Sequence, residues 1–264
     1  MKIAVIQLNS QDDPEANLAV AGEWIRRAAQ AGAELVALPE TFTFCGPLDQ
    51  APRYAEPVPG PTTRAVAAVA RECGVYILAG SLHERVEGQA KPFNTSLLID
   101  RDGSIVARYR KIHLFDVPGP DVESDNIQAG CEVVVTTVRR RRFGLSICYD
   151  LRFPELYREL ATRGAEILFV PSAFTMQTGR DHWEVLLRAR AIENLAYVVA
   201  PNQSGPHPPD RDCYGHSMIV DPWGTVLCRV PDGVGMATAE VDLARVAEIR
   251  RTLPALDHRR LGRY

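Results

Sequence analysis

The stretch that decides the fold is A-G-A-E-L-V-A-L-P-E-T-F, residues 31–42, because it recurs later in the chain as R-G-A-E-I-L-F-V-P-S-A-F, residues 163–174. Each copy places a short apolar run between a glycine and a proline, which is typical of a buried strand that follows a helix. A second pair matches in the same order, at residues 93–108 and 214–229. The sequence therefore predicts an internal pseudo-duplication, with halves of about 1–115 and 141–230.

Each half reads as alternating strands and helices followed by a hairpin. Asp13 and Pro14 predict the start of a helix that runs to about Gln30, because Asp is a favoured N-cap and Pro fits the first turn. A second helix is expected to begin at a Thr62 or Thr63 cap. The remaining signals predict strands at 2–8, 34–38 and 75–79, a hairpin at 94–109, and loops at 42–61 and 110–130.

Two similar half-sheets, each covered by helices on one face, bury their bare faces against each other. The expected fold is therefore α/β, a four-layer α-β-β-α sandwich that forms a single domain over residues 1–264. A flat doubly wound sheet is the alternative, but the hairpin in each half favours mixed sheets. Residues 7–10, Q-L-N-S, lack the glycine-rich phosphate loop of a dinucleotide-binding fold. Residues 242–264 read as a short helix and an extended C-terminal tail.

The composition is that of an ordinary globular enzyme and gives no reason to expect nucleic-acid or membrane partners. Of the 264 residues, 46% are hydrophobic and 24% are charged, and the formal net charge is −3. Without a basic excess, the chain has no electrostatic attraction to nucleic acid or to an anionic membrane surface. No apolar run approaches the roughly 20 residues that span a bilayer. Residues 1–8 enter a strand-like run directly, without a signal-peptide layout.

The cysteines are far apart in the chain and form no C-x-x-C pair, so neither a metal site nor a disulfide framework is expected. Reduced thiols indicate an intracellular protein, and we expect it in the cytoplasm. The six are Cys45, Cys73, Cys131, Cys148, Cys213 and Cys228.

Cys148 is the candidate nucleophile because of its place in the pattern. Residues 143–147, F-G-L-S-I, read as a buried strand, and a polar turn at 149–152 leads to Pro154 at the start of a helix. A cysteine on a turn between a strand and a helix is a common way to present a nucleophile. The alternative is that Cys148 is a small core residue, as most free cysteines are.

Other residues offer partners for this thiol. Glu40 comes directly after an apolar strand, where desolvation would raise its carboxyl pKa toward the range of a general base. Lys111, in Y-R-K-I-H, would lower the pKa of the thiol and bind an oxyanion. His113 is a second candidate base for the cysteine. Taken singly, each is also explained as a surface or loop residue.

The combination resembles the carbon–nitrogen hydrolase, or nitrilase, superfamily. Its three signatures look like L-P-E-T-F (38–42), Y-R-K-I-H-L-F-D (109–116) and G-L-S-I-C-Y-D-L-R-F-P-E-L (144–156). The sequence Cys-Tyr-Asp after the strand is similar to amidase members, whereas true nitrilases usually have Cys-Trp-Glu. Within the superfamily the chain resembles the Nit branch most, through residues 178–194, 214–224 and 256–261.

This resemblance implies a role for each matching residue. Cys148 is expected to attack an amide carbonyl and form a thioester, while Glu40 takes up the thiol proton, passes it to the leaving amine and then activates water. Lys111 and the backbone N–H of Tyr149 are expected to stabilise the oxyanion. Glu123 matches a second glutamate that assists in this superfamily. The mechanism implies no metal and no cofactor.

The resemblance also suggests the substrate class. The Nit branch is associated with ω-amides of 2-oxo acids and with deaminated glutathione, which carry carboxylates that arginine binds well. Arg152 follows the nucleophile turn, and Arg180 is expected in the loop that matches the one after Glu40; a structural salt bridge is the alternative for Arg152. The pocket wall is expected to include Phe174, Thr178 and His182.

Other functions compete with this interpretation. A Cys–His hydrolase or acyltransferase would use Cys148 with His113 or His182, and a scaffold protein would keep the fold without catalysis. A broad-specificity aliphatic amidase or nitrilase is a further alternative for the substrate. The resemblance suggests a homodimer, since a tail such as 242–264 has no obvious place in the first 230 residues.

Overall fold

The computed structural model describes residues 1–118 and 122–261, and within them two six-stranded mixed sheets carry the fold. The first sheet has the order β14-β1-β2-β3-β4-β5, and the second has the order β13-β12-β9-β8-β7-β6. The strands of the first are β1 (Lys2–Gln7), β2 (Leu35–Ala37), β3 (Tyr76–Glu84), β4 (Phe93–Ile99), β5 (Ile105–Arg110) and β14 (Gly235–Glu240). Those of the second are β6 (Val135–Val138), β7 (Arg141–Leu145), β8 (Ile167–Phe169), β9 (Tyr197–Ala200), β12 (Met218–Val220) and β13 (Val226–Arg229).

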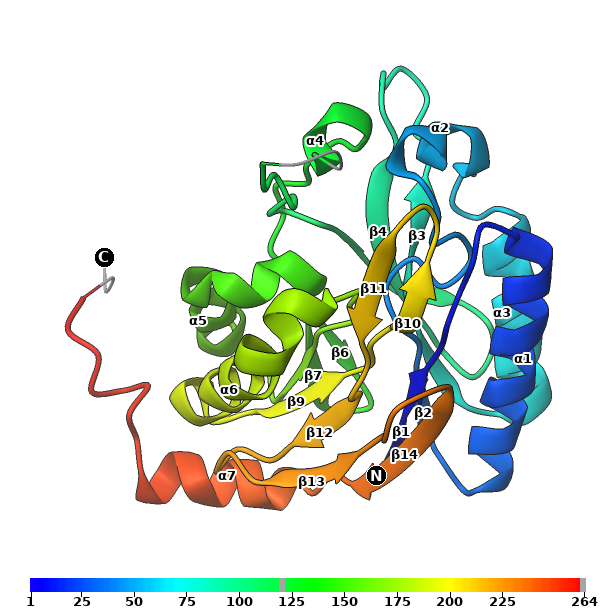
Figure 1. Ribbon diagram of the computed structural model, residues 1–264. Coiled ribbons are helices and arrows are strands. Elements are labelled where there is room, and N and C mark those ends of the chain that lie inside the picture. The colour runs from blue at the N-terminus through cyan, green and yellow to red at the C-terminus, as the bar shows by residue number, and fades with distance from the viewer. Residues whose placement is uncertain (119–121, 262–264) are drawn as a thin grey trace.

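Helices form the two outer layers of the sandwich (Figure 1). On one side lie α1 (Pro14–Gln30) and α3 (Pro61–Cys73), and on the other lie α5 (Pro154–Thr162) and α6 (Met176–Asn194). The last helix, α7 (Leu243–Thr252), follows β14 of the first sheet, and Asp242 caps its N-terminus. This is the predicted α/β, four-layer α-β-β-α sandwich.

The predicted pseudo-duplication is visible in the strand order. Strands β1-β2-β3-β4-β5 and β7-β8-β9-β12-β13 are each built of two parallel pairings followed by two antiparallel ones. Each sheet then gains one antiparallel edge strand, β14 beside β1 and β6 beside β7. The halves therefore have the same topology, and each ends in the predicted hairpin.

The core explains why the strands read as continuous apolar runs. In the first sheet, Ile3, Val5 and Leu35 join a buried cluster that also contains Leu145 and Phe169 of the second sheet. The alternate residues of the same strands pack instead under α1 and α3, in a cluster with Ala4, Ile6, Val36, Ile25 and Val66. Because side chains alternate across a strand, burial of both faces makes every position apolar.

Some local predictions were wrong. The N-cap of α3 is Gly60 rather than Thr62 or Thr63, and Thr63 Oγ1 accepts a hydrogen bond from the Gly60 N–H at 2.6 Å. The predicted loops contain short helices, η1 (Leu48–Gln50) with α2 (Ala51–Tyr54), and α4 (Glu123–Asn126). A second hairpin, β10 (Ser204–His207) with β11 (Arg211–Tyr214), was not predicted. Residues 262–264 of the predicted tail lie outside the described residues.

Across residues 1–118 and 122–261, none of the helices combines the length and the apolar character that crossing a membrane requires.

Candidate active site

Four side chains that the sequence singled out meet between the two sheets. Glu40 follows β2, Lys111 follows β5, Glu123 begins α4, and Cys148 follows β7. β2 and β7 belong to different sheets, and Glu40 and Cys148 lie just beyond their carboxyl ends. The pseudo-symmetric packing brings these ends together, as expected for functional groups in α/β folds.

Glu40 is buried, with 4% of its surface exposed, and both of its carboxylate oxygens are bonded. Oε1 accepts hydrogen bonds from Lys111 Nζ at 3.0 Å and from Asn94 Nδ2 at 2.9 Å. Oε2 accepts the backbone N–H of Ala173 at 2.8 Å, and the Cys148 thiol is a further hydrogen-bonding neighbour of the carboxyl group. These contacts fix the carboxylate between the ammonium and the sulfur.

Lys111 is held between two carboxylates. Its ammonium donates to Glu40 Oε1 at 3.0 Å and to Glu123 Oε2 at 2.8 Å, and the residue is 2% exposed. Burial alone would lower the pKa of the ammonium, but Glu123 and Glu40 raise it well above its usual value. Lys111 therefore stays positively charged and can stabilise a developing oxyanion.

Glu123 is fixed by the loop that follows β5. Its Oε2 accepts the backbone N–H of Phe115 at 2.7 Å as well as the Lys111 ammonium, and its Oε1 accepts Asn94 Nδ2 at 3.2 Å. Glu123 is 5% exposed, so this is a buried carboxylate rather than a solvated one. The sequence identified Glu123 but not Asn94, because a polar residue inside a hairpin strand gives no local signal of function.

Cys148 stands on the predicted turn, a 3₁₀ segment from Cys148 to Arg152 that precedes Pro154 at the start of α5. Its φ is +45°, a left-handed conformation that is uncommon for a residue with a side chain and that clusters at functional sites. Its N–H donates to Pro171 O at 3.0 Å, which ties the turn to the end of β8. Glu40 is the neighbouring group that acts on this thiol, through its charge and a side-chain hydrogen bond, and both raise the pKa of the thiol.

The pKa values of this pair differ from the predicted ones. Burial would raise the pKa of the Glu40 carboxyl, but Lys111 and the hydrogen bonds from Cys148, Lys111 and Ala173 leave it below its usual value. Burial and the neighbouring Glu40 charge raise the pKa of the Cys148 thiol well above its usual value, against the opposing effect of Lys111. The predicted directions, a raised Glu40 pKa and a lowered Cys148 pKa, are therefore wrong. At neutral pH the Glu40 carboxyl is ionised and the Cys148 thiol is protonated.

The nucleophile turn is anchored by Asp150, which is fully buried. Its oxygens accept the N–H of Ile147 at 2.8 Å, the N–H of His113 at 3.0 Å and the hydroxyl of Tyr109 at 2.6 Å. The ring of His113 bonds to Asp150 through Nδ1 at 2.7 Å and stacks on Phe153 at 3.7 Å. His113 thus serves the turn that carries Cys148, and its ring contacts do not include the thiol.

The predicted substrate-binding residues divide into two groups. Tyr149 lies edge-to-face with Phe115 and Phe153, and Arg152 lies over the rings of Tyr149 and Phe174 at 5.8 and 5.3 Å. Within the described ranges, Arg152 has no carboxylate partner, so no structural salt bridge holds it there. Its polar contact is with the ring of His182, Nη1 to Nδ1 at 3.3 Å.

Arg180 was expected in a loop, and this prediction is wrong. Thr178, Arg180 and His182 all lie on the first turns of α6, whose range begins at Met176. The side chains of Arg180 and His182 are exposed there, and Thr178 is half-buried and hydrogen-bonded to Thr175 at 3.1 Å. The apolar spacing of α6 was too weak to predict a helix at this end of the segment.

Cys45 is a second thiol close to the same region. Burial would raise the pKa of its thiol, but Arg211, His207 and Thr41 lower it to about 7. Arg211 Nη2 donates to the Cys45 sulfur at 3.0 Å. The sequence did not predict this microenvironment, because Arg211 lies 166 residues away in the unpredicted hairpin.

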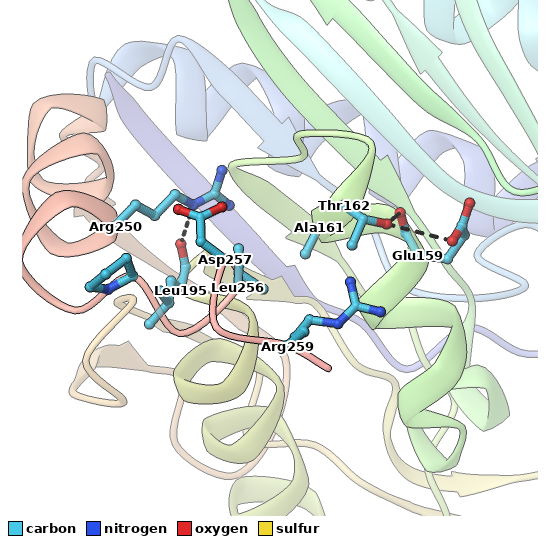
Figure 2. Close-up of a pocket in the computed structure, with 9 residues that line it drawn as sticks. Glu159, Ala161, Thr162, Leu195, Arg250, Leu256, Asp257 and Arg259 are labelled. Atoms are coloured by element: carbon cyan, nitrogen blue, oxygen red, sulfur yellow. Dashed lines mark hydrogen bonds between the residues drawn. The ribbon is translucent and has the colours of Figure 1, made fainter. Parts of the chain in front are cut away.

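A separate hollow of about 470 Å³ lies between α5, α7 and the C-terminal tail (Figure 2). Its lining includes Glu159, Arg250 and Arg259, and none of Glu40, Lys111 or Cys148 belongs to it. The hollow is therefore separate from the cluster of Glu40, Lys111 and Cys148.

Known proteins resemble this chain over nearly its whole length. The family model "Carbon-nitrogen hydrolase" matches residues 2–251. A deaminated glutathione amidase from Synechocystis sp. (strain PCC 6803 / GT-S) is 45% identical over 263 residues, which cover 97% of each protein. Human omega-amidase NIT2 is 37% identical over 267 residues, which cover 100% of this chain and 96% of that protein.

Solved structures agree with these sequence matches. The NitFhit protein of C. elegans has a TM-score of 0.91 and 43% sequence identity, with 100% of this chain and 66% of that chain covered. A variant of an amidase from Nesterenkonia sp. AN1, with acrylamide added at its active-site cysteine, has a TM-score of 0.82 and 28% identity, covering 96% and 98% of the two chains.

Proposed function

The chain belongs to the carbon–nitrogen hydrolase family and is an amidase that hydrolyses amide C–N bonds; on that premise we propose that Cys148 forms a thioester with the acyl group. The observation that carries the proposal is the buried contact of Glu40 with both Cys148 and Lys111. A base, a cation and a thiol in direct contact are the parts that nucleophilic acyl transfer needs.

The proposed first step moves one proton and forms one bond. Glu40 is ionised and takes the proton of the Cys148 thiol as the sulfur attacks the amide carbonyl. The carbonyl oxygen becomes an oxyanion, which Lys111 and the backbone N–H of Tyr149 stabilise. When the tetrahedral intermediate collapses, the C–N bond breaks and Glu40 returns the proton to the leaving nitrogen, which departs as ammonia or an amine.

The second step restores the enzyme. Glu40 takes a proton from water, the resulting hydroxide attacks the thioester carbonyl, and the sulfur leaves and regains the proton from Glu40. Glu123 keeps the Lys111 ammonium oriented and charged during both steps, because it bonds to the same nitrogen at 2.8 Å. A Cys–His mechanism has less support, because His113 bonds to Asp150 and His182 to Arg152.

For the substrate, we propose a carboxylate-bearing amide, either deaminated glutathione or the ω-amide of a 2-oxo acid. The names of the Synechocystis and human relatives support this class. The structural support is Arg152, which lies on the nucleophile turn over two aromatic rings and has no carboxylate partner among the described residues. A substrate carboxylate would pair with the positive charge of the Arg152 guanidinium through charge-assisted hydrogen bonds.

The test compares 2-oxoglutaramate, deaminated glutathione and the neutral amide pentanamide by ammonia or amine release. Arg152→Leu should raise KM for the carboxylate substrates about 10- to 100-fold, since a hydrogen bond between charged groups is worth roughly 1.5–3 kcal/mol. The KM for pentanamide should change little. Arg180→Leu, on the exposed start of α6, is the matched control and should leave both classes unchanged.

Two outcomes would contradict the substrate class. One is a wild-type enzyme that hydrolyses pentanamide as efficiently as it hydrolyses the carboxylate-bearing amides. The other is a loss of carboxylate preference in Arg180→Leu with none in Arg152→Leu, which would move the binding role to α6.

We also propose that residues 1–264 act as one domain that assembles as a homodimer. Support for one domain comes from β14, which follows the second half in sequence but pairs with β1 of the first sheet. Support for a dimer comes from exposed apolar side chains on one outer face: Val185 and Ile192 on α6 are 66% and 47% exposed, and Trp223 beside them is 58% exposed.

A further inference from the structure

Asn94 connects the two glutamates of the cluster. It lies on β4, is 2% exposed, and donates from Nδ2 to Glu40 Oε1 at 2.9 Å and to Glu123 Oε1 at 3.2 Å. Its backbone carbonyl accepts the N–H of Lys111 at 2.9 Å. One residue therefore contacts the base, the second carboxylate and the backbone of the cation.

The need for such a donor follows from charge. Lys111 carries one positive charge, whereas Glu40 and Glu123 both bond to its ammonium, at 3.0 and 2.8 Å. Two buried carboxylates that share a single cation favour protonation of one of them. The NH₂ group of an amide has two hydrogens and no charge, so Asn94 can give one hydrogen to each carboxylate without adding charge to the cluster.

The other end of the same side chain argues against a role in folding. Asn94 Oδ1 is buried and has no hydrogen-bond partner among residues 1–118 and 122–261. An unsatisfied buried oxygen destabilises the folded state. The contribution of the amide therefore comes from its nitrogen, which donates to both carboxylates.

We propose that Asn94 is a positioning residue for the amidase reaction. It holds the Glu40 carboxylate ionised and in place beside Cys148, and it holds Glu123 on Lys111, while acting only through these side chains. The proposal rests on the catalytic roles proposed above for Glu40 and Cys148. It adds a residue for which neither the sequence motifs nor the spacing gave a signal.

The first expected effect is on rate and pH dependence. Asn94→Leu should lower kcat/KM by about 10- to 100-fold, the size expected for a misplaced catalytic group, with most of the loss in kcat. Loss of the hydrogen bond raises the pKa of Glu40, since that bond favours the carboxylate. The acidic limb of the kcat/KM profile should therefore move to higher pH.

The variant Asn94→Asp distinguishes a role in hydrogen bonding to the carboxylates from a role in filling space. This variant keeps the shape but places a third carboxylate beside Glu40 and Glu123, so the group can donate a hydrogen bond only when it is protonated. Its activity relative to wild type should be highest at acidic pH and fall as pH rises. A residue that only fills space would give Leu and Asp variants with unchanged pH profiles.

Ser96→Ala is the matched control. Ser96 lies two residues along β4, is fully buried, and has a hydroxyl without a hydrogen-bond partner in the described part of the chain. The control should keep wild-type activity and pH profile, and melting temperatures of all variants show whether they fold. Wild-type kcat and pH profile in Asn94→Leu would overturn the proposal.

A second readout keeps this test independent of the substrate. Because the Cys148 thiol is protonated at neutral pH, its alkylation by iodoacetamide needs Glu40 as base. The alkylation rate at pH 7, followed by peptide mass spectrometry, should fall in Asn94→Leu and not in Ser96→Ala. If the wild-type enzyme hydrolyses none of the amides but Asn94→Leu still loses alkylation, Asn94 remains a positioning residue and the proposed substrates are refuted. An unchanged alkylation rate in Asn94→Leu would refute the proposed role of Asn94.

Discussion

The protonation state of Glu40 depends on the balance of opposing effects on its carboxyl pKa. Burial favours the protonated acid, whereas Lys111 and the hydrogen bonds favour the anion and prevail. The thiol of Cys148 responds in the opposite way, because burial and the Glu40 anion both favour the protonated form. The resting pair is therefore a carboxylate and a thiol, and in the proposed mechanism proton transfer between them accompanies attack on the substrate.

His83 gives a pH prediction that belongs to a single residue. Burial, with Arg211 and Lys111 nearby, lowers the pKa of the His83 imidazole from 6.5 to about 4 despite the opposing effect of Glu40. Below pH 6.5 the unfolded chain binds a proton at this residue that the folded chain does not bind. Folding stability should therefore fall as pH drops from 6.5 toward 4.

The measurement is urea unfolding of wild type and His83→Gln at pH 7 and pH 5. The wild type should lose roughly 2 kcal/mol more than the variant over this interval, from the two pKa values and the linkage relation. An equal loss in both proteins would show that His83 titrates in the folded state as it does in the unfolded one.

Elements could be predicted from the sequence where burial made them regular. The strands β1, β2 and β8 lie between a helix layer and the opposing sheet, and their unbroken apolar runs were recognised. β14 and the β10–β11 hairpin were missed, because G-M-A-T-A-E and S-G-P-H show no apolar alternation. β14 is defined by its partner: Lys2 pairs with Glu240, far away in sequence.

In the candidate site, too, residues within local sequence motifs could be predicted, whereas residues defined by distant contacts could not. Glu40, Lys111 and Cys148 follow strands whose motifs are local, so the sequence could identify them. Asn94 and the N–H of Ala173 gain their roles only from the Glu40 carboxylate that packs against them, 54 and 133 residues away. Sequence spacing carries no signal for contacts of this kind.

The outer face of α6 provides a prediction at the scale of elements. Val185 and Ile192 are exposed on this helix, and Gly224 of the β12–β13 turn lies against Ile192, which brings Trp223 beside them. A two-fold contact of this face with a second copy would bury these side chains. Val185→Glu combined with Trp223→Glu should therefore convert a dimer into monomers at micromolar concentration.

Light scattering after size-exclusion chromatography measures this change. Val20→Glu is the matched control, since Val20 is 44% exposed on α1 in the opposite outer layer and should leave the mass unchanged. A wild-type monomer, or a double variant with unchanged dimer mass, would contradict the proposed interface.

At the scale of the molecule, the duplication gives each functional residue an equivalent position in the other half. Only one of the two positions holds the functional residue. Strand register makes Leu35 equivalent to Ile167 and Ile3 equivalent to Phe143, so Glu40 corresponds to Ser172 and Cys148 to Leu8. Asn94 likewise corresponds to Gly215. The first sheet therefore supplies the proposed base and the second sheet supplies the proposed nucleophile, so the proposed mechanism requires both halves packed together.

The central claim is that this shared cluster makes Cys148 the nucleophile, and the most direct measurement is peptide mass spectrometry of enzyme quenched in acid during turnover of 2-oxoglutaramate. Cys45 is the competing thiol, because its pKa is lowered to about 7 and it is the more acidic of the two. The account predicts an acyl group on Cys148, no turnover by Cys148→Ala, and normal turnover by Cys45→Ala. An acyl group on Cys45, or turnover that survives Cys148→Ala, would contradict it.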